Sequence, residues 1–272
     1  MSRGAFQQKV VVVTGGCAGI GRALALRFAQ AGARIAILDV QDEPLVAFRE
    51  QLMTKINAEV LAIHCDVADD SACQQAIGQV IEHFGGVDVL INNAGITHRS
   101  EFADTDLEVF QRIMAVNYFG ALHCTRHALD SLIERKGQII VLSSISGFAP
   151  LLYRSAYNAS KHALHGLFET LRLEVRERGV NVMLVSPGYT ATDIRKNALV
   201  GDGSINQASI VAPFKVASPN DVADDIYLGA VKRKRLLVLS NVDWRARFLS
   251  RFFPRLFERW MLPRLSGVKL QR

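Results

Sequence analysis

Short apolar segments alternate along the chain with longer segments in which apolar residues recur every three or four positions. The short segments are nearly continuous runs of Val, Ile and Leu, which are typical of strands buried on both faces of a parallel sheet. These lie at Lys9–Thr14, Arg34–Asp39, Glu59–Asp66, Val87–Asn92, Gln138–Ser143, Asn181–Ser186 and Arg235–Ser240. Helical spacing occurs between them, for example at Gly19–Ala31, Ser71–Phe84, Leu107–Arg135 and Ser155–Arg178. The alternation predicts an α/β fold with a single-domain, Rossmann-type, doubly wound parallel sheet of about seven strands.

The C-terminal segment has a different pattern. Aromatic and apolar residues recur there at four-residue steps, and arginines recur at the same interval: Trp244, Phe248, Phe252, Leu256 and Trp260; Arg247, Arg251, Arg255 and Arg259. This predicts one or two amphipathic helices, broken near Pro254 and stopped by Pro263. We therefore expect a catalytic domain at 1–240 and a basic amphipathic extension at 241–272.

Two roles for this extension stay open at the level of sequence. Aromatic side chains beside arginines suit an interfacial membrane anchor, with the arginines near acidic headgroups. The same helices would otherwise pack on the body, or on a second subunit, and cover a substrate pocket. The pattern does not decide between the two roles.

Composition narrows the class of protein. Of 272 residues, 49% are hydrophobic and 21% are charged, which is typical of a folded globular chain. Residues 232–272 hold 12 of the 32 Lys and Arg but only 2 of the 26 Asp and Glu, so the excess of positive charge lies in the tail. Because the rest of the chain is not basic, we expect no nucleic-acid partner. No signal-peptide pattern or spanning apolar run occurs, so we expect a cytoplasmic protein, in contact with a membrane at most through its tail. Four cysteines without CxxC pairing are expected to be free thiols.

A glycine-rich turn follows the first predicted strand. Val10–Val13 leads into the sequence TGGCAGIG at Thr14–Gly21, and a helical pattern begins there. Glycines let the backbone approach a pyrophosphate, and the free N–H groups of a helix N-terminus favour its charge. Asp39 ends the second strand, where a carboxylate accepts hydrogen bonds from ribose hydroxyls and repels a 2′-phosphate. With no basic residue at Cys17, Ala18, Val40 or Gln41, the sequence favours NAD over NADP, although NADP stays open.

Further motifs follow in order: NNAG at Asn92–Gly95, Asn117, Ser144, YNASK at Tyr157–Lys161, and Pro187–Gly188. Together with TGxxxGIG they resemble the classical short-chain dehydrogenase/reductase family over residues 8–240. The resemblance implies an NAD(P)-dependent oxidoreductase that works as a homodimer or homotetramer. It places the cofactor on Gly15, Cys17, Ala18, Gly19, Ile20, Gly21, Asp39, Asp66, Val67, Asn93, Ala94, Gly95, Tyr157, Lys161, Pro187, Gly188, Thr190 and Thr192.

The candidate catalytic residues are Ser144, Tyr157 and Lys161. Tyr157 and Lys161 are four positions apart in a helical pattern and share one face, so the ammonium is expected to lower the pKa of the phenol. Tyr157 would then exchange a proton with the substrate oxygen during hydride transfer, while Ser144 holds that oxygen. The resemblance further implies that Lys161 binds the nicotinamide ribose and that Asn117 holds a water extending the proton path.

Two segments are expected to wall the substrate pocket, Ile145–Arg154 and Tyr189–Lys215. The first is markedly apolar, which favours an apolar substrate, and the candidate substrate contacts are Ser144, Phe148, Leu151, Tyr157 and Tyr189. The chain is also similar to the narrower branch of dehydrogenase/reductase member 7 and 11β-hydroxysteroid-dehydrogenase-like enzymes. That branch implies lipid- or steroid-like alcohols and ketones and a role in lipid metabolism. The sequence departs from that branch in having Asp39 in place of its usual NADP-type pattern, and we expect no N-terminal membrane helix of the kind found in that branch.

The favoured function is therefore interconversion of an apolar secondary alcohol and its ketone with NAD. One alternative is an NADPH-dependent 3-oxoacyl-type or lipid ketone reductase. Another, of a different class, is a cofactor-binding peripheral membrane or regulatory protein with little turnover, which the intact catalytic set disfavours. His123 and His127 have a spacing that can ligate a metal, but no third ligand has a matching context, so no metal site is expected.

Overall fold

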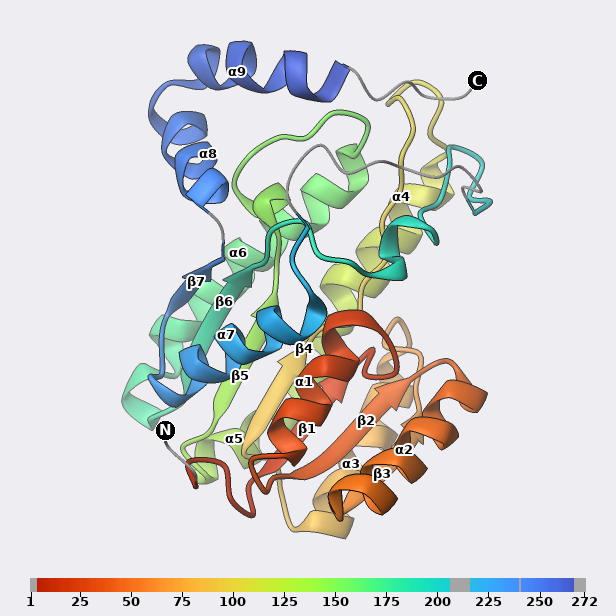
Figure 1. Ribbon diagram of the computed structural model, residues 1–272, viewed down its shortest axis with the longest axis vertical. Coiled ribbons are helices and arrows are strands. Elements are labelled where there is room, and N and C mark those ends of the chain that lie inside the picture. The colour runs from red at the N-terminus through yellow and green to blue at the C-terminus, as the bar shows by residue number, and fades with distance from the viewer. Residues whose placement is uncertain (1–3, 206–215, 240, 267–272) are drawn as a thin grey trace.

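Seven parallel strands form the centre of the protein (Figure 1). The computed structural model describes residues 4–205, 216–239 and 241–266, apart from the side chains of 241–244 and 262–266. The strands are β1 (Val10–Thr14), β2 (Arg34–Asp39), β3 (Val60–His64), β4 (Val89–Asn92), β5 (Gln138–Leu142), β6 (Asn181–Ser186) and β7 (Leu236–Val238). Their order in the sheet is β3-β2-β1-β4-β5-β6-β7, so the direction of winding reverses between β1 and β4. The predicted doubly wound Rossmann-type sheet is confirmed.

Helices cover both faces of this sheet. One face carries α1 (Gly19–Ala29), α2 (Asp42–Ile56) and α7 (Pro219–Val231), and the other carries α3 (Asp70–Phe84), α5 (Gly120–Glu134) and α6 (Ser155–Glu174). In β1, Val11 and Val13 enter the first core, whereas Val10 and Val12 enter the second. All four side chains are fully buried, which explains why this strand is apolar without alternation.

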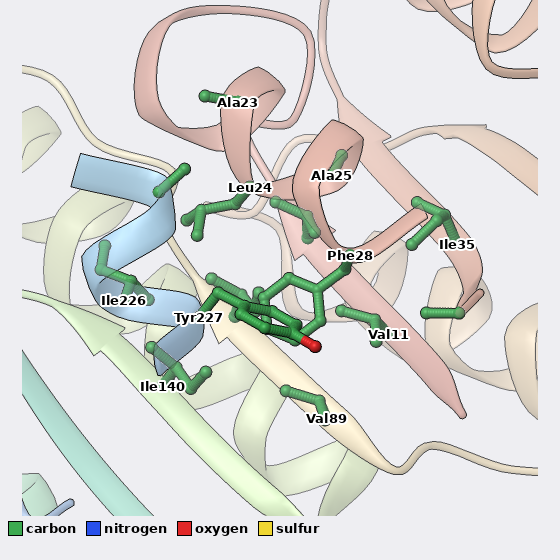
Figure 2. Close-up of a cluster of buried hydrophobic side chains, with 14 of the residues drawn as sticks. Val11, Ala23, Leu24, Ala25, Phe28, Ile35, Val89, Ile140, Ile226 and Tyr227 are labelled. Carbon is green, nitrogen blue, oxygen red and sulfur yellow. The ribbon is translucent and has the colours of Figure 1, made fainter. Parts of the chain in front are cut away.

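Helix α1, which follows the glycine turn, packs closely against α7. Figure 2 shows Phe28 of α1 and Tyr227 of α7 side by side above Val11 and Val89 of the sheet. Their ring centroids lie 5.3 Å apart in an edge-on arrangement, which is a favourable aromatic geometry. This contact anchors the helix whose N-terminus follows the glycine turn.

The segment predicted as one helix over Leu107–Arg135 contains a change of winding. It consists of α4 (Leu107–Met114), a π-helical turn at Ala115–Phe119 and α5. Asn117 lies within this turn, and its side chain is buried. Such π turns are frequent at functional sites.

The tail forms two helices, α8 (Asn241–Phe252) and α9 (Pro254–Ser266), which lie above the sheet in Figure 1. The break near Pro254 is confirmed, and this proline takes the first position of α9, where its missing N–H costs nothing. The expectation that Pro263 stops the helix is wrong, because α9 continues to Ser266. A proline three residues from a helix end removes one hydrogen bond of the last turn, and the helix continues past it here.

The inner side of the tail packs on the segment after β5. Ala246, Phe257 and Met261 are buried in one cluster with Ile145 and Ala149. The Ser250 hydroxyl also donates a hydrogen bond of 2.9 Å to the Phe148 carbonyl oxygen. The structure thus places the tail against the predicted substrate-pocket wall.

The outer side of the tail is apolar and basic. Phe248, Phe252, Phe253 and Leu256 are each more than half exposed, and four arginines are exposed beside them: Arg245, Arg251, Arg255 and Arg259. Trp260, predicted on the same stripe, is instead partly buried in the inner cluster, and the side chain of Trp244 lies outside the described residues. Within the described ranges, no helix is long and apolar enough to cross a bilayer.

Candidate active site

Two adjoining clefts open at the carboxyl ends of the central strands, where the winding reverses. The larger has a volume of about 510 Å³ and the smaller about 160 Å³. They share five lining residues: Ile20, Asn93, Gly95, Thr192 and Ile194. Ligands of doubly wound folds bind at this position, so the two clefts form one candidate site with a long arm and a short arm.

Most predicted cofactor residues line the larger cleft: Gly15, Ala18, Gly19, Ile20, Asp39, Asp66, Val67, Asn93, Ala94, Gly95 and Thr192. The remaining predicted residues Tyr157, Lys161, Pro187, Gly188 and Thr190 line the smaller cleft. Neither cleft is lined by Cys17 or Gly21. Val40 and Gln41 also line the larger cleft, beside Asp39. The sequence analysis used these two residues only as evidence that no basic residue follows Asp39, and did not predict them as cofactor contacts.

Cys17 belongs to the turn and not to the cleft wall. Its side chain is buried in the core, and its backbone N–H donates a 2.9 Å hydrogen bond to the Asp39 carboxylate. Burial, reinforced by the neighbouring Asp39 charge, raises the pKa of the Cys17 thiol to about 12. The Cys17 side chain therefore faces the protein interior, and a contact between this residue and the cofactor stays a prediction.

The glycine turn has the shape of a cradle that side chains would fill. Gly15 has a φ of +61°, a left-handed conformation that favours glycine. A Cβ added at Gly21 would lie less than 3.0 Å from the Gly15 carbonyl oxygen and from the Asn93 side-chain amide. That amide donates 2.9 Å hydrogen bonds to the carbonyl oxygens of Thr14 and Gly15, joining the loops after β1 and β4. A pyrophosphate-bearing cofactor fits this cradle, because the backbone and the start of α1 are open to it.

Asp39 is held firmly at the far end of the larger cleft. One carboxylate oxygen accepts the Cys17 N–H, and the other accepts the Gln41 N–H at 3.2 Å. The side chain is buried but lines the cleft. Each carboxylate oxygen keeps acceptor capacity beyond one hydrogen bond, so the group can also accept from a ribose hydroxyl.

Ser144, Tyr157 and Lys161 come together in the smaller cleft. Ser144 follows β5; its hydroxyl accepts the Ser146 N–H at 3.2 Å and lies near enough to the Tyr157 phenol on α6 to lower its pKa. Lys161, one turn further along α6, is buried and donates a 2.8 Å hydrogen bond to the Leu142 carbonyl oxygen. Ser143, the neighbouring serine, instead directs its hydroxyl to the Lys161 carbonyl oxygen at 3.5 Å. Two hydroxyls and one amine therefore converge on the short arm.

The electrostatics of this set differ from the prediction. Burial raises the pKa of Tyr157 above its ordinary value; Arg154 gives the largest opposing effect, followed by the hydrogen bond from Ser144. Lys161 was expected to lower this pKa, but its amine lies 5.6 Å from the centre of the Tyr157 ring and is itself deprived of water. Burial lowers the pKa of Lys161 to about 8. Arg154, and not Lys161, is the cation that lowers the pKa of Tyr157 against this burial, so the expected effect of Lys161 is not supported.

Asn117 links three elements below the cleft. Its side-chain oxygen accepts the Ile96 N–H at 2.8 Å, and its nitrogen donates to the Ile96 carbonyl and the Ser160 hydroxyl, both at 3.0 Å. Both N–H donors of the amide are thus used within the protein. The side chain fixes the loop after β4 against α6, and a role for it in holding a water stays a prediction.

The predicted substrate contacts are only partly in place. Leu151 and Tyr189 line the smaller cleft with Ser144 and Tyr157. Phe148 does not line it, because its backbone and ring face the tail and His165. The second predicted wall extends to Lys215, and its residues 206–215 lie outside the described residues.

Arg154 and Arg195 also line the smaller cleft. Each lies within a segment predicted to wall the substrate pocket, although neither side chain was predicted as a substrate contact. Arg154 immediately precedes α6, where the positive end of the helix dipole disfavours a cation, so helix formation does not explain an arginine at this position.

His123 and His127, whose spacing could ligate a metal, make separate contacts: His123 with the Val67 carbonyl oxygen and His127 with the Asp70 carboxylate.

Comparison with known proteins gives a consistent set of relatives. Residues 9–201 match the short chain dehydrogenase family. The chain is 37% identical over 269 residues to dehydrogenase/reductase SDR family member 7B of Bos taurus, covering 96% of this chain and 83% of the relative. It is 33% identical to a family protein 7-like of Drosophila melanogaster, covering 97% and 82%. The sequence resemblance to the member 7 branch is confirmed.

Solved structures agree on the fold. A short chain dehydrogenase/reductase from Burkholderia phymatum in complex with NAD has a TM-score of 0.82 at 24% identity, covering 93% of this chain and 96% of that chain. An alcohol dehydrogenase from Thermococcus sibiricus complexed with 5-hydroxy-NADP has a TM-score of 0.76 at 26% identity, covering 86% and 97%. The two neighbours differ in the cofactor they hold.

Proposed function

This chain belongs to the short-chain dehydrogenase family, and from that premise we propose that it interconverts an apolar secondary alcohol and its ketone, with Tyr157 as the acid–base. The observation that carries the proposal is the convergence of the Ser144 and Tyr157 hydroxyls in a cleft that adjoins the glycine cradle. Bound nicotinamide would supply or accept the hydride. The enzyme class is that of NAD(P)-dependent oxidoreductases.

Each residue of the short arm has a proposed task. Ser144 holds the substrate oxygen by a hydrogen bond, and Tyr157 gives a proton to that oxygen or takes one from it. Lys161 binds the nicotinamide ribose, and Asn117 positions the loop and helix around it. Apolar side chains around the reacting end, including Leu142, Ile145 and Leu151, support an apolar substrate of a lipid- or steroid-like kind.

We propose NAD as the preferred cofactor, with oxidation as the favoured direction. Asp39 supports this preference, because a buried carboxylate at this position would repel a 2′-phosphate. An NADPH-dependent 3-oxoacyl-type or lipid ketone reductase is the competing assignment. Cofactor binding without turnover on a broad panel of alcohols and ketones would favour the non-enzymatic alternative.

Exchange of Asp39 for asparagine tests the cofactor preference. Asp39→Asn keeps an acceptor for the Cys17 N–H but removes the negative charge, so the ratio of NADPH to NADH affinity is expected to rise at least about tenfold. Titration of each cofactor by protein-to-nicotinamide fluorescence transfer measures this ratio. Asp42→Asn is the control, since Asp42 is an exposed carboxylate three residues further along that pairs with His64 and does not line the cleft. A wild-type preference for NADPH would overturn the NAD assignment.

We propose that the chain divides into a catalytic domain at 1–240 and a covering extension at 241–272. The inner face of the tail packs on the cleft wall, and the free outer face supports a second role, peripheral contact with an anionic membrane. A cytoplasmic homodimer or homotetramer, acting in lipid metabolism, is the assembly we propose for the enzyme, with no nucleic-acid partner.

Vesicle flotation tests the outer face of the tail. The full chain is expected to float with vesicles containing anionic lipid, and Phe248→Ser with Phe252→Ser is expected to abolish flotation. Leu173→Ser is the matched control, because Leu173 is equally exposed but lies on α6. If the wild-type chain stays in the soluble fraction, the tail serves only as a cover.

A further inference from the structure

The short arm of the cleft carries positive charge that the proposed chemistry does not use. Arg154 and Arg195 line it together with Lys161. Within the described part of the chain, no aspartate or glutamate lines this arm. Burying unbalanced charge is costly, so a cleft of this kind is expected to have an anionic partner.

Arg154 stands closest to the reacting groups. It immediately precedes α6, three positions before Tyr157, and its guanidinium donates a 2.6 Å hydrogen bond to the Thr97 hydroxyl. Among the described residues, no carboxylate lies within ion-pair distance of it. Burial and the charge of Arg195 lower its pKa, while Tyr157 and Tyr189 oppose that effect. A guanidinium stays charged throughout the physiological range all the same.

Arg195 adds a second charge on the opposite loop. It donates a 3.3 Å hydrogen bond to the Thr190 carbonyl oxygen and lies 5.5 Å from the centre of the Tyr189 ring. The nearby carboxylate of Asp193 is engaged with Lys196 at 2.8 Å.

We propose that the substrate carries an anionic group, a carboxylate or a phosphate monoester, which Arg154 binds with support from Arg195. Arginine offers a planar fork of N–H donors that matches both of these groups. The hydrogen bond to Thr97 holds the fork in place, and the remaining wall of the arm is mainly apolar. The substrate is thus amphiphilic, with its charge near the carbon that reacts. This inference rests on the proposed function, since it names the substrate class of the same site.

A different role for Arg154 makes opposite predictions. If its charge acted only on the Tyr157 phenol, removing it would lower turnover of neutral and anionic substrates alike and shift the pH profile. If it binds the substrate, its removal affects anionic ligands selectively and leaves neutral ligands unchanged. A comparison of matched ligands separates these roles.

The experiment measures binding of octanoate, octyl phosphate and octan-2-ol to the cofactor-loaded full chain by isothermal titration calorimetry. We expect the two anions to bind at least about tenfold more tightly than the alcohol, and Arg154→Gln to remove that preference. Arg154→Lys is expected to restore it in part, and Thr97→Val to weaken it without removing the charge. Arg126→Gln, an exposed arginine on α5, is the control. The relative affinities of octanoate and octyl phosphate show which headgroup the site prefers.

Two results would overturn the inference: equal binding of the alcohol and the anions, or an equal loss for all three ligands in Arg154→Gln. Because this measurement needs no turnover, it is independent of the proposed reaction. Selective anion binding without oxidation or reduction of any alcohol or ketone would refute the proposed function and leave the anion site standing. Turnover of apolar alcohols without selective binding of anions would support the proposed function and refute the anion site.

Discussion

Replacing Tyr157 by phenylalanine is expected to lower turnover by between about a hundredfold and ten-thousandfold, the range typical of a lost general acid–base. The ring stays in place, so binding of the cofactor is expected to change little. Initial rates with an apolar secondary alcohol, together with a fluorescence titration of the cofactor, measure both quantities. Because burial raises the pKa of Tyr157, oxidation by the wild-type enzyme is also expected to speed up as pH rises, since the deprotonated phenol accepts the proton.

Tyr227→Phe is the matched control for this substitution. Tyr227 is buried between α1 and the sheet, remote from both clefts, so the loss of its hydroxyl is expected to leave turnover within about twofold. Ser144→Ala is expected to reduce turnover by a smaller factor than Tyr157→Phe, because Tyr157 alone exchanges the proton. Unchanged turnover in Tyr157→Phe would remove this residue from the chemistry.

Adding one methyl group at Gly21 is expected to weaken cofactor binding by at least about a hundredfold, equivalent to about 2.7 kcal/mol. The new Cβ would collide with the Gly15 carbonyl oxygen and the Asn93 amide, so the turn has to open and the cradle loses its shape. Fluorescence transfer from protein to NADH measures the affinity. Circular dichroism of the same sample shows whether the fold survives.

Gly78→Ala is the control for this second prediction. Gly78 is exposed in α3, with nothing within 4 Å of an added Cβ, so alanine is expected to stabilise the helix by up to about 1 kcal/mol and leave the affinity unchanged. If Gly21→Ala folded and bound NADH as the wild type does, the pyrophosphate would have to lie elsewhere.

The strand pattern of this chain was readable from sequence because its physical cause is local. A run such as Val10–Val13 is apolar at every position only where both faces of a strand are covered, and that condition also identifies the parallel sheet. The motifs after β1, β4 and β5 then met at one edge, because parallel strands direct their carboxyl ends the same way. The parallel sheet and the shared direction of its strands together predict the main cofactor cleft at this edge.

The features that could not be predicted from the sequence depend on contacts between segments that are distant along the chain. Phe148 looked like a pocket residue because it lies in an apolar loop, but the tail, a hundred residues later, engages it. Arg154 ends the predicted wall Ile145–Arg154, but the absence of acidic residues from the short arm could be seen only in the described structure. The raised pKa of Tyr157 likewise reflects burial, which a four-residue spacing does not reveal.

The tail shows the limit of periodicity over two helices. Four-residue steps advance by about 400° at 3.6 residues per turn, so a stripe drifts by about 40° at each step. The break between α8 and α9 then turns the second helix independently of the first. Phe248 therefore faces outward, whereas Trp260 joins the inner cluster.

Isotope transfer tests the central claim most directly. The purified chain is incubated with reduced nicotinamide cofactor carrying deuterium at both hydrogens of the reactive carbon and with an apolar ketone, and the alcohol product is analysed by mass spectrometry. We expect the wild type to form an alcohol with one deuterium on the carbinol carbon, and Tyr157→Phe to form it more slowly by the factor given above. Bound cofactor with no deuterated alcohol from any ketone of a broad panel, carboxylates and phosphates included, would contradict it.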